Sequence, residues 1–594
     1  MAYQLSPGVA WSEIDLTTVV PATSTTVGAI AGDFEWGPVN DVTTVSSEID
    51  LVSLFGLPSD NVAPTWFTAA NFLAYGNDLK VVRSLNPGDK NATSNGTFGS
   101  AYVGSIKNRN DWELNWSNLT DTSKGNTFSG MFAAKYPGTY VNGLKISMYA
   151  APSAANDTAW TSWAYQSQFN APPGTSKYVS DRAGANDEFH LIVVDVDGKF
   201  TGGAANTVIE KFPNISKARD AKNFDGSSNY WVNVIADQSK FLWPIAQPAN
   251  TSGQFDSNWG SLCSNTTFTT GFAANDGNLS SNVTISLAGG TASLSNTNIV
   301  SNAYAKFSDT DAYDVSLIMM GAANNETTKW VIQNVAEPGG TYGRGDCVVF
   351  CSPLYSDCVN KPGQEVNSII ASRNVLGSSS YGFMDSGWKK QYDKYTNGGV
   401  YRWVPLNGDI AGLCARTDLN RDPWFSPAGL NRGQIKNVTQ LAWAPSKADR
   451  DSLYKNNINP VVTFKGEGTV LYGDKTLQTK PSAFDRINVR RLFIVLEKSI
   501  SKAAKYSLFE FNDEFTRSQF VALVEPFLRD VKGRRGIYDY KVVCDTTNNT
   551  QQVIDSNQFV GDIYIKPARS INFIQLNFVA VRSGVAFSEI VGKF

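Results

Sequence analysis

The sequence predicts a multidomain protein of mixed class. We expect an α/β core with a C-terminal antiparallel sheet, an inserted outer β domain of barrel or sandwich type, and extended strand arms at both ends. Three observations lead to this expectation. Apolar residues alternate with a two-residue period at both termini, a β, α, β order follows the first terminus, and a tract rich in Asn, Ser, Thr and Gly interrupts that order. At 594 residues the chain is also too long for a single hydrophobic core.

Both ends of the chain have the pattern of a short amphipathic strand without a partner nearby in sequence. The first arm spans residues 1–20 and the second spans residues 583–594. The apolar side chains of each arm share one face: Tyr3, Leu5, Val9 and Trp11 at the start, and Val585, Phe587 and Val591 at the end. An unpaired strand can add to an exposed sheet edge and gain backbone hydrogen bonds there. We therefore expect each copy of the chain to pair its arms with other copies.

Residues 21–90 are predicted to form the first part of the inner α/β core. The apolar run at 27–34 predicts a strand, and the run at 65–75 predicts a helix that ends at Gly76. A second strand is expected at 79–85. This order is the β, α, β unit of a layered α/β domain.

Residues 91–185 are expected to form a separate inserted domain. Here the composition changes to Asn, Ser, Thr, Gly, Trp and Tyr, with short apolar alternations such as the one at 139–148. Short alternating runs between turn residues predict a small β-barrel or sandwich on the surface.

Residues 186–360 are predicted to resume the α/β domain. Continuous apolar runs are typical of strands covered on both faces. Strands are expected at 189–196, 230–235, 314–320 and 347–351, and helices at 206–214 and 326–335. The tract at 251–302 has almost no charge, which predicts exposed hairpins or a poorly ordered loop.

Residues 361–582 are predicted to form the C-terminal core domain. The expected elements are a helix at 364–374, a strand with turns at 459–480, a long helical region at 487–512, a helix at 513–532 capped by Asn512, and strands at 538–544, 561–567 and 571–582. The last strands form an antiparallel set that would accept the arms. Its candidate acceptor residues are Ile563, Ile565, Ile574, Leu576 and Phe578.

The composition gives no sign of a nucleic-acid or membrane partner. The net charge of −3 does not favour binding to nucleic acid or to anionic lipid. No apolar run approaches the roughly 18 residues that a membrane span needs. The opening residues lack the basic and then apolar layout of a signal peptide, so we expect a soluble chain that stays in the cytoplasm.

The sequence also offers little for catalysis or for a metal site. His190 is the only histidine, so every mechanism that needs an imidazole would depend on it. It lies in an apparent strand, where a packed or edge histidine is expected. Cys347, Cys351 and Cys358 lack a fourth ligand for zinc, and we expect buried thiols. We therefore predict no enzyme activity, no metal and no cofactor.

The glycine-rich run GGTYGRGD does not predict a phosphate-binding loop, and its Arg-Gly-Asp triplet does not by itself predict a cell-adhesion motif. It lacks the Gly-Lys-Ser/Thr ending that holds phosphates. Its Arg344-Gly345-Asp346 triplet stands in a loop before a strand, where we interpret it as incidental.

Four segments together resemble a known family. They are similar to the tail sheath proteins of contractile-tailed bacteriophages. The four segments are LSPGVAWSEID, AGDFEWGPVNDVTTVSSEIDLVSLFG, GDIAGLCARTDLNRDPWFSPAG and GDKTLQTKPSAFDRINVRRLFIVLEKSI. The resemblance that they carry extends over both ends and the central core, roughly half of the chain.

The resemblance implies a mechanical role. Sheath proteins of this family stack as six-membered rings in a helical sleeve around a tail tube, and they meet a baseplate and a tail terminator protein. The sleeve shortens to drive the tube through the host envelope during genome delivery. Their arms complete a sheet on the C-terminal domain of neighbouring subunits. The resemblance therefore implies a virion tail protein that assembles in the host bacterial cytoplasm without nucleotide.

Charged residues in the family-like segments are candidates for contacts between core domains. These residues are Arg416, Asp418, Arg421, Arg490 and Arg491. Exposed charges are usually solvated, so an interface role competes with plain solvation at each position.

Two other functions stay open at this point. One is the sheath of a phage-derived injection particle or of a type VI-like secretion system. The other is a surface carbohydrate-binding protein, which the 15 Trp, the 23 Tyr and the Asn- and Thr-rich insertion would suit.

Overall fold

The structure is a computed structural model that describes residues 24–94, 105–119, 131–150, 158–247, 258–269, 271–273, 279–396, 398–572 and 575. The described residues fall into two compact units. The smaller unit contains residues 424–426 and the chain from Lys502 onward, and the larger unit contains the rest.

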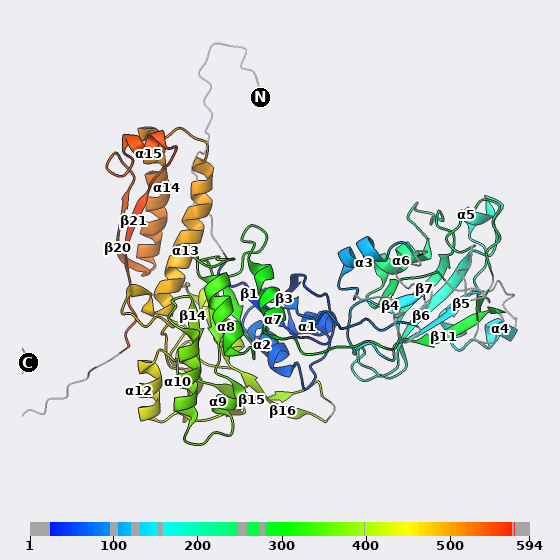
Figure 1. The fold of residues 1–594 in the computed structure, drawn as a ribbon, viewed down its shortest axis with the longest axis horizontal. Helices are drawn as coiled ribbons and strands as arrows, with labels where there is room; N and C mark the ends of the chain where they lie inside the picture. The colour runs from blue at the N-terminus through cyan, green and yellow to red at the C-terminus, as the bar shows by residue number, and fades with distance from the viewer. Residues whose placement is uncertain are drawn as a thin grey trace, which may run out of the picture. The chain divides into compact units, whose positions relative to one another are not determined.

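A six-stranded sheet is the centre of the larger unit (Figure 1). Its order is β14-β13-β12-β1-β3-β2, and all neighbours are parallel except the pair β2 and β3. The strands are β1 (Gly28–Gly32), β2 (Thr43–Val45), β3 (Leu79–Arg83), β12 (Leu317–Met319), β13 (Val348–Cys351) and β14 (Gly382–Met384). The strands expected at 27–34, 79–85, 314–320 and 347–351 are thus confirmed. Their continuous apolar sequence fits burial on both faces.

Helices cover both faces of this sheet. Leu317 and Met319 pack into one apolar cluster with α2 (Ala63–Leu73) and α11 (Asn407–Asn420). Ile318 points to the opposite face and packs with α7 (Thr297–Tyr304), α8 (Asn325–Val331) and α10 (Glu365–Leu376). The alternation along β12 therefore builds two separate cores, as a strand period of two requires.

Two glycines bring α11 against α2. A Cβ at Gly408 would lie 2.3 Å from the backbone oxygen of Thr68, and a Cβ at Gly412 would lie 2.5 Å from the ring of Tyr75. A spacing of four residues places both glycines on one face of the helix. This close packing explains the segment GDIAGLCARTD, which the sequence analysis left without an assigned element.

The rest of the larger unit consists of smaller elements. A three-stranded antiparallel sheet has the order β16-β15-β17, and β18 pairs with β19. Their bounds, with the remaining helices, are α1 (Glu48–Phe55), α9 (Tyr355–Cys358), β15 (Trp388–Asp393), β16 (Val400–Pro405), β17 (Gln440–Leu441), α12 (Lys447–Lys455), β18 (Val461–Phe464), β19 (Gly468–Leu471) and α13 (Ile487–Ala504). α13 ends eight residues earlier than the region expected at 487–512.

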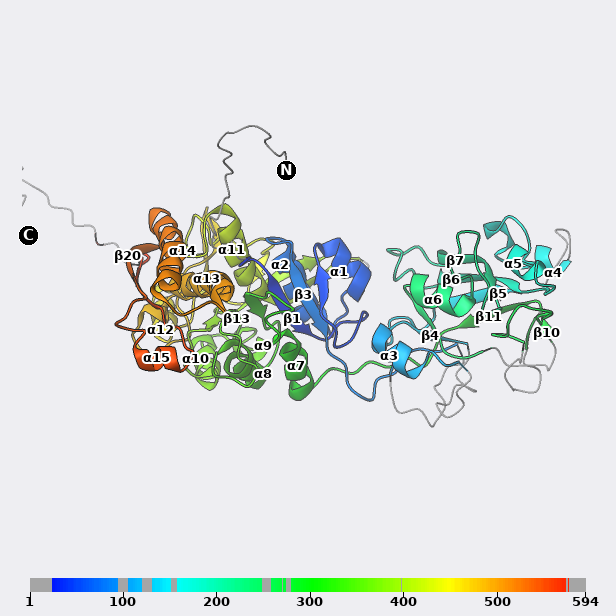
Figure 2. The same ribbon diagram turned by 90° about the horizontal axis from the view of Figure 1, so that it is seen from above.

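The inserted domain has a four-stranded antiparallel sheet of order β11-β5-β6-β7 (Figure 2). A separate antiparallel pair consists of β4 and β8. The described strands do not close into a barrel. The elements are α3 (Arg109–Asn115), β4 (Phe132–Ala134), β5 (Lys145–Tyr149), α4 (Thr158–Thr161), α5 (Lys177–Ser180), β6 (Glu188–Asp195), β7 (Thr207–Ser216), α6 (Trp231–Gln238), β8 (Leu242–Pro244), β9 (Phe272–Ala273), β10 (Leu279–Ser280) and β11 (Asn282–Ser286).

Three assignments in this region were wrong. The strand expected at 189–196 exists as β6, but it pairs with β5 and not with the core sheet. The helix expected at 206–214 is strand β7, and the strand expected at 230–235 is helix α6. Short apolar runs do not distinguish a strand from a buried helix, which explains the exchange.

The outgoing and returning segments of the insertion lie side by side. The carboxylate of Asp89 accepts hydrogen bonds from the backbone N–H and the hydroxyl of Ser293, at 3.0 and 2.9 Å. The N–H of Thr291 donates to the backbone oxygen of Lys90 at 3.1 Å. The two ends of the inserted domain are therefore joined at its base.

Tryptophan in the inserted domain is used for its core. The members of this set are all buried: Trp112, Trp116, Trp160, Trp163, Trp231, Trp243 and Trp259. Buried rings cannot stack on a sugar, so the aromatic content that suggested a carbohydrate-binding protein has a packing role in these seven cases.

His190 is a packed histidine, as expected. Its ring stacks on Phe169 with centroids 4.1 Å apart. Its Nδ1 accepts from the N–H of Asn214 at 3.1 Å, so Nε2 carries the hydrogen and donates to the backbone oxygen of Ala171 at 2.9 Å. Asn214 lies at a bulge in β7 with a φ of 49°, which aims its N–H at the ring.

We expect the inserted domain to lose stability on acidification. Burial lowers the pKa of His190 from 6.5 to about 4, so between these values the unfolded chain binds a proton that the folded chain does not. The loss begins as the pH falls through 6.5 and amounts to about 3 kcal/mol by pH 4, at about 1.4 kcal/mol per pH unit. Carbon-13 labelling of the single imidazole allows an NMR titration, which should show a midpoint near 4. A midpoint near 6.5 in the folded protein would contradict this expectation.

The smaller unit contains α14 (Glu514–Gly533), β20 (Ile537–Val543), α15 (Gln551–Asp555) and β21 (Asp562–Pro567). The expected helix and the first two expected strands are confirmed. The cap was wrong, because Asp513 and not Asn512 accepts from the N–H of Thr516. Asn512 instead donates to the backbone oxygen of Gln558 at 2.8 Å. Most of the strand expected at 571–582 lies outside the described residues.

Candidate assembly interface

The sheet of β20 and β21 is the candidate acceptor for the arms. It has only two strands, and within the described part of the chain neither outer edge pairs with a further strand. Ile563 pairs with Val542, and Ile565 pairs with Tyr540. An isolated two-stranded sheet is marginally stable in water, so this one depends on neighbours.

Helix α14 supports one face of this sheet. The buried side chains of the helix are Phe520, Val524, Leu528 and Val531, together with Thr516 and Arg517. The hydroxyl of Tyr540 donates to the backbone oxygen of Glu525 at 3.3 Å, which joins β20 to the helix. Ile563 and Ile565 remain half-buried, and Tyr564 between them is exposed. Apolar surface is thus still available beside the free backbone edges.

The other predicted arm and acceptor residues lie outside the described residues. These are Tyr3, Leu5, Val9, Trp11, Ile574, Leu576, Phe578, Val585, Phe587 and Val591. Their pairing stays a prediction.

Asp418 and Arg491 form a buried ion pair between α11 and α13. Each side chain is 4 % exposed, and an Nη atom of Arg491 contacts an Oδ atom of Asp418. The hydroxyl of Thr25 donates to the same carboxylate oxygen. Thr25 is the second described residue of the chain, so this contact joins the start of the described chain to α11.

The remaining candidate interface residues differ in exposure. Arg490 is buried, with its guanidinium 4.5 Å from the ring centroid of Tyr381. Arg416 is half-buried and donates to the backbone oxygen of Arg432 at 2.6 Å. Arg421 is exposed. The structure thus brings Asp418 and Arg491 together within the chain, and a role of any of the five between copies stays a prediction.

Lys498 joins α13 to two loops of the larger unit through ion pairs and a hydrogen bond, which its position in the sequence did not predict. Its Nζ lies 2.6 Å from a carboxylate oxygen of Asp314 and 3.3 Å from one of Asp346, and it donates to the hydroxyl of Ser316 at 2.9 Å. One feature of the sequence could have predicted these contacts: Lys498 lies on the apolar side of a predicted helix, and a charge in that position needs a buried partner.

The Arg344-Gly345-Asp346 triplet is structural. The side chain of Arg344 is 0 % exposed, pairs with Asp346 at 2.8 Å and donates to the backbone oxygen of Tyr313 at 2.9 Å. A buried guanidinium cannot engage a receptor, which confirms the incidental reading.

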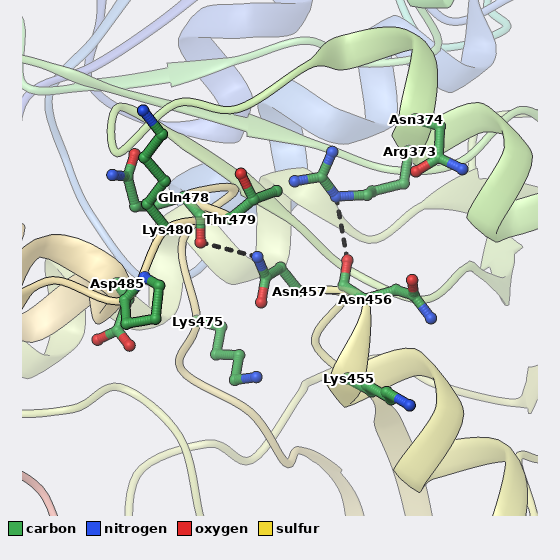
Figure 3. A pocket seen from close by; sticks show the side chains of 11 residues that line it. Arg373, Asn374, Lys455, Asn456, Asn457, Lys475, Gln478, Thr479, Lys480 and Asp485 are labelled. Atoms are coloured by element: carbon green, nitrogen blue, oxygen red, sulfur yellow. Dashed lines mark hydrogen bonds between the residues drawn. The ribbon is translucent and has the colours of Figure 1, made fainter.

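The cleft in Figure 3 is rich in cations, but two of them stabilise helix ends. Arg373 donates to the backbone oxygens of Asn456 and Gly377, which follow α12 and α10. Lys475 donates to the backbone oxygen of Tyr454 in the last turn of α12 at 2.7 Å. Cations at helix C-termini satisfy carbonyls that lack helical partners. The cleft is therefore a capping arrangement and does not by itself indicate a ligand.

The described ranges hold neither a cluster of metal ligands nor a membrane-spanning helix. They contain no group of three or more His, Cys, Asp or Glu side chains placed to hold a metal ion. No helix among the described residues has both the length and the apolar character needed to span a membrane.

Three family descriptions match the chain. "Tail sheath protein Gp18 domain III N-terminal region" matches residues 25–83, "Phage tail sheath protein central domain" matches 296–477, and "Phage tail sheath C-terminal domain" matches 479–580. The inserted domain lies between the first two of these matches.

Two curated relatives that match along nearly their whole length agree with these family descriptions. The tail sheath protein of Vibrio phage KVP40 is 35 % identical over 677 residues, covering 99 % of this chain and 100 % of the relative. That of Enterobacteria phage T4 is 34 % identical over 696 residues and covers 99 % of both chains. A solved sheath tail protein from Desulfitobacterium hafniense has 9 % identity and a TM-score of 0.49, over 94 % of this chain and 100 % of that one. The resemblance in the sequence is thus confirmed, and the chain belongs to the phage tail sheath protein family.

Proposed function

We propose that this chain is the structural subunit of a contractile phage tail sheath, which polymerises as stacked six-membered rings around a tail tube. The observation that carries the proposal is similarity to curated tail sheath proteins along 99 % of the chain. The partners are other copies, the tube protein, the baseplate and the tail terminator protein. Shortening of the sleeve drives the tube through the host envelope, and no cofactor or catalytic step takes part.

The two-stranded sheet supports a specific means of connection. The arms of neighbouring copies extend β20 and β21, whose outer edges have no further strand among the described residues. Backbone hydrogen bonds give the affinity, and the apolar face of each arm fixes the register beside Ile563 and Ile565. Contacts of this kind that do not close on themselves produce helical stacks.

In the proposed sleeve, the inserted domain lies on the outside. Its core is separate from the two cores of the central sheet, and both of its ends join the chain at one point. We extend its range beyond 185, because β5 and β6 belong to the same sheet.

Removal of both arms should abolish polymerisation. A chain without residues 1–16 and 583–594 should fold, as judged by circular dichroism, because it keeps both cores of the central sheet. It should not form hollow tubes in electron micrographs at concentrations where the full chain does.

A matched pair of full-length variants distinguishes the effect of the arm's apolar face on assembly from the effect of shortening the chain. Serine at Tyr3, Leu5, Val9 and Trp11 removes the apolar face and should prevent tubes. Alanine at Gln4, Ser6 and Ser12 alters the opposite face and should leave them. Normal hollow cylinders from the armless chain would refute the pairing mechanism.

A further inference from the structure

The connection between α13 and α14, together with the first two residues of α14, is an unusual surface segment, defined here as residues 506–515. Five of its ten side chains are large, apolar or aromatic, and between 61 and 105 % exposed: Tyr506, Leu508, Phe509, Phe511 and Phe515. Scattered apolar residues are normal on a surface, but a contiguous cluster marks an interaction site.

The backbone and charge of segment 506–515 are also distinctive. Phe509 has a φ of 70°, a conformation that a bulky residue rarely adopts. Strain of this kind is found at sites where the surroundings or a function require it. The segment contains Glu510, Asp513 and Glu514 and no cation. Its partner must therefore offer an apolar floor and a positive rim.

A groove of the larger unit has these properties. It has a volume of about 380 Å³ and lies between α2, β15 and residues 437–439. Apolar side chains supply part of its lining, namely Phe67, Ala70, Ala74 and Val438, beside the ring of Tyr392 and six polar residues.

Two ammonium groups stand at the edge of this groove. Lys394 lines it and lies 3.3 Å from the carboxylate of Glu48. Lys436 donates from Nζ to the backbone oxygen of Ala74, another lining residue, at 2.6 Å. Among the lining residues the charges of Lys394 and Glu48 balance, so the excess positive charge comes from Lys436 beside the groove and is opposite in sign to segment 506–515.

From this complementarity we infer that segment 506–515 of one copy docks into the groove of another copy and inserts Phe509 or Phe511. The inference rests on the proposed self-assembly and adds a second contact to arm pairing. The other basic depression, in Figure 3, is the less suitable receptor, because polar side chains make up nearly all of its lining. An aromatic ring gains little free energy from burial against such a surface.

Cysteine trapping between copies tests the contact directly. One full-length chain has Phe511→Cys and another has Thr439→Cys, which is at the groove. The two are mixed, assembled and oxidised with copper phenanthroline. All six native cysteines are buried, so background cross-linking should be low. We expect a dimer on a non-reducing gel that appears only in the mixture.

Two controls use the same chemistry at other exposed positions. Phe224 is 111 % exposed on the inserted domain, and Phe224→Cys mixed with Thr439→Cys should give no dimer. Phe511→Cys mixed with Thr479→Cys reports on the depression of Figure 3. A dimer with Thr479→Cys instead of Thr439→Cys, or no dimer in assembled tubes, would overturn the inference.

A polymerisation assay provides an independent measurement. Phe509→Ser with Phe511→Ser should raise the concentration needed for tube formation by about tenfold or more, because these side chains belong to the interface and not to the core. Phe224→Ser should leave it within about twofold. Equal effects of the two changes would contradict the docking. Failure of the unaltered chain to form tubes would instead contradict the proposed function.

Discussion

Asparagine in place of Asp418 should destabilise the contact between α11 and α13 by about 3 to 5 kcal/mol, the cost of leaving a buried charge without its partner. The Arg491 guanidinium would remain 4 % exposed with only neutral groups to face. The change is nearly isosteric, so packing alone predicts little effect. Hydrogen exchange followed by mass spectrometry should show faster exchange in peptides from both helices.

Two comparisons make this result specific. Asp181→Asn removes an exposed ion pair with Lys177, whose side chains are 51 and 86 % exposed, and should change stability by less than about 1 kcal/mol. Asp418→Leu with Arg491→Met removes both charges and should recover most of the loss. If Asp418→Asn and Asp181→Asn behaved alike, the buried pair would have no special role.

Methionine in place of Arg83 should have an effect of similar size, about 3 to 5 kcal/mol, because several buried carbonyls would lose their donor at once. The side chain donates to the backbone oxygens of Phe34 and Gly37 in the core, at 2.8 and 3.0 Å. It also donates to Pro137 of the inserted domain at 2.8 Å. Burial lowers the pKa of Arg83 to about 10, so the group remains charged at neutral pH.

The expected signature of this change is local as well as global. Limited proteolysis should cut the variant near residues 33–37 and 135–140 before it cuts elsewhere. Arg83→Lys should not restore the stability, because a single ammonium group cannot reach all the carbonyl oxygens that the planar guanidinium contacts. Arg109→Met, at a side chain that is 57 % exposed, is the matched control. An Arg83→Met chain as resistant to protease as this control would contradict the expectation.

Local signals account for the parts of the fold that were predicted. The first β, α, β unit follows from an apolar run, a helix that stops near Gly76 and a second apolar run, all within 60 residues. The errors fall where the same composition suits two structures. In β7, Pro213 and Asn214 resemble a helix end, but tertiary pairing with β6 places them at a bulge. In α6, apolar residues at 231, 234 and 235 have helical spacing, yet the run is short enough to be mistaken for a strand.

The candidate site was predictable only in part, for a related reason. The candidate acceptor strands β20 and β21 are amphipathic and close in sequence, so the alternating pattern alone predicted them. Asp418 and Arg491 are 73 positions apart, and the sequence shows two charges in helical segments without showing that they meet. The docking groove draws on α2, β15 and the 437–439 segment, which only the folded chain brings together.

The hydrogen bonds between Asp89 and Ser293 and between Lys90 and Thr291 have a practical consequence. A domain whose two ends lie side by side can be replaced by another domain, because the rest of the chain then needs only a short loop to connect the two cut ends. The same junction therefore offers a place to graft a foreign cargo onto each copy, repeated over the whole length of a particle.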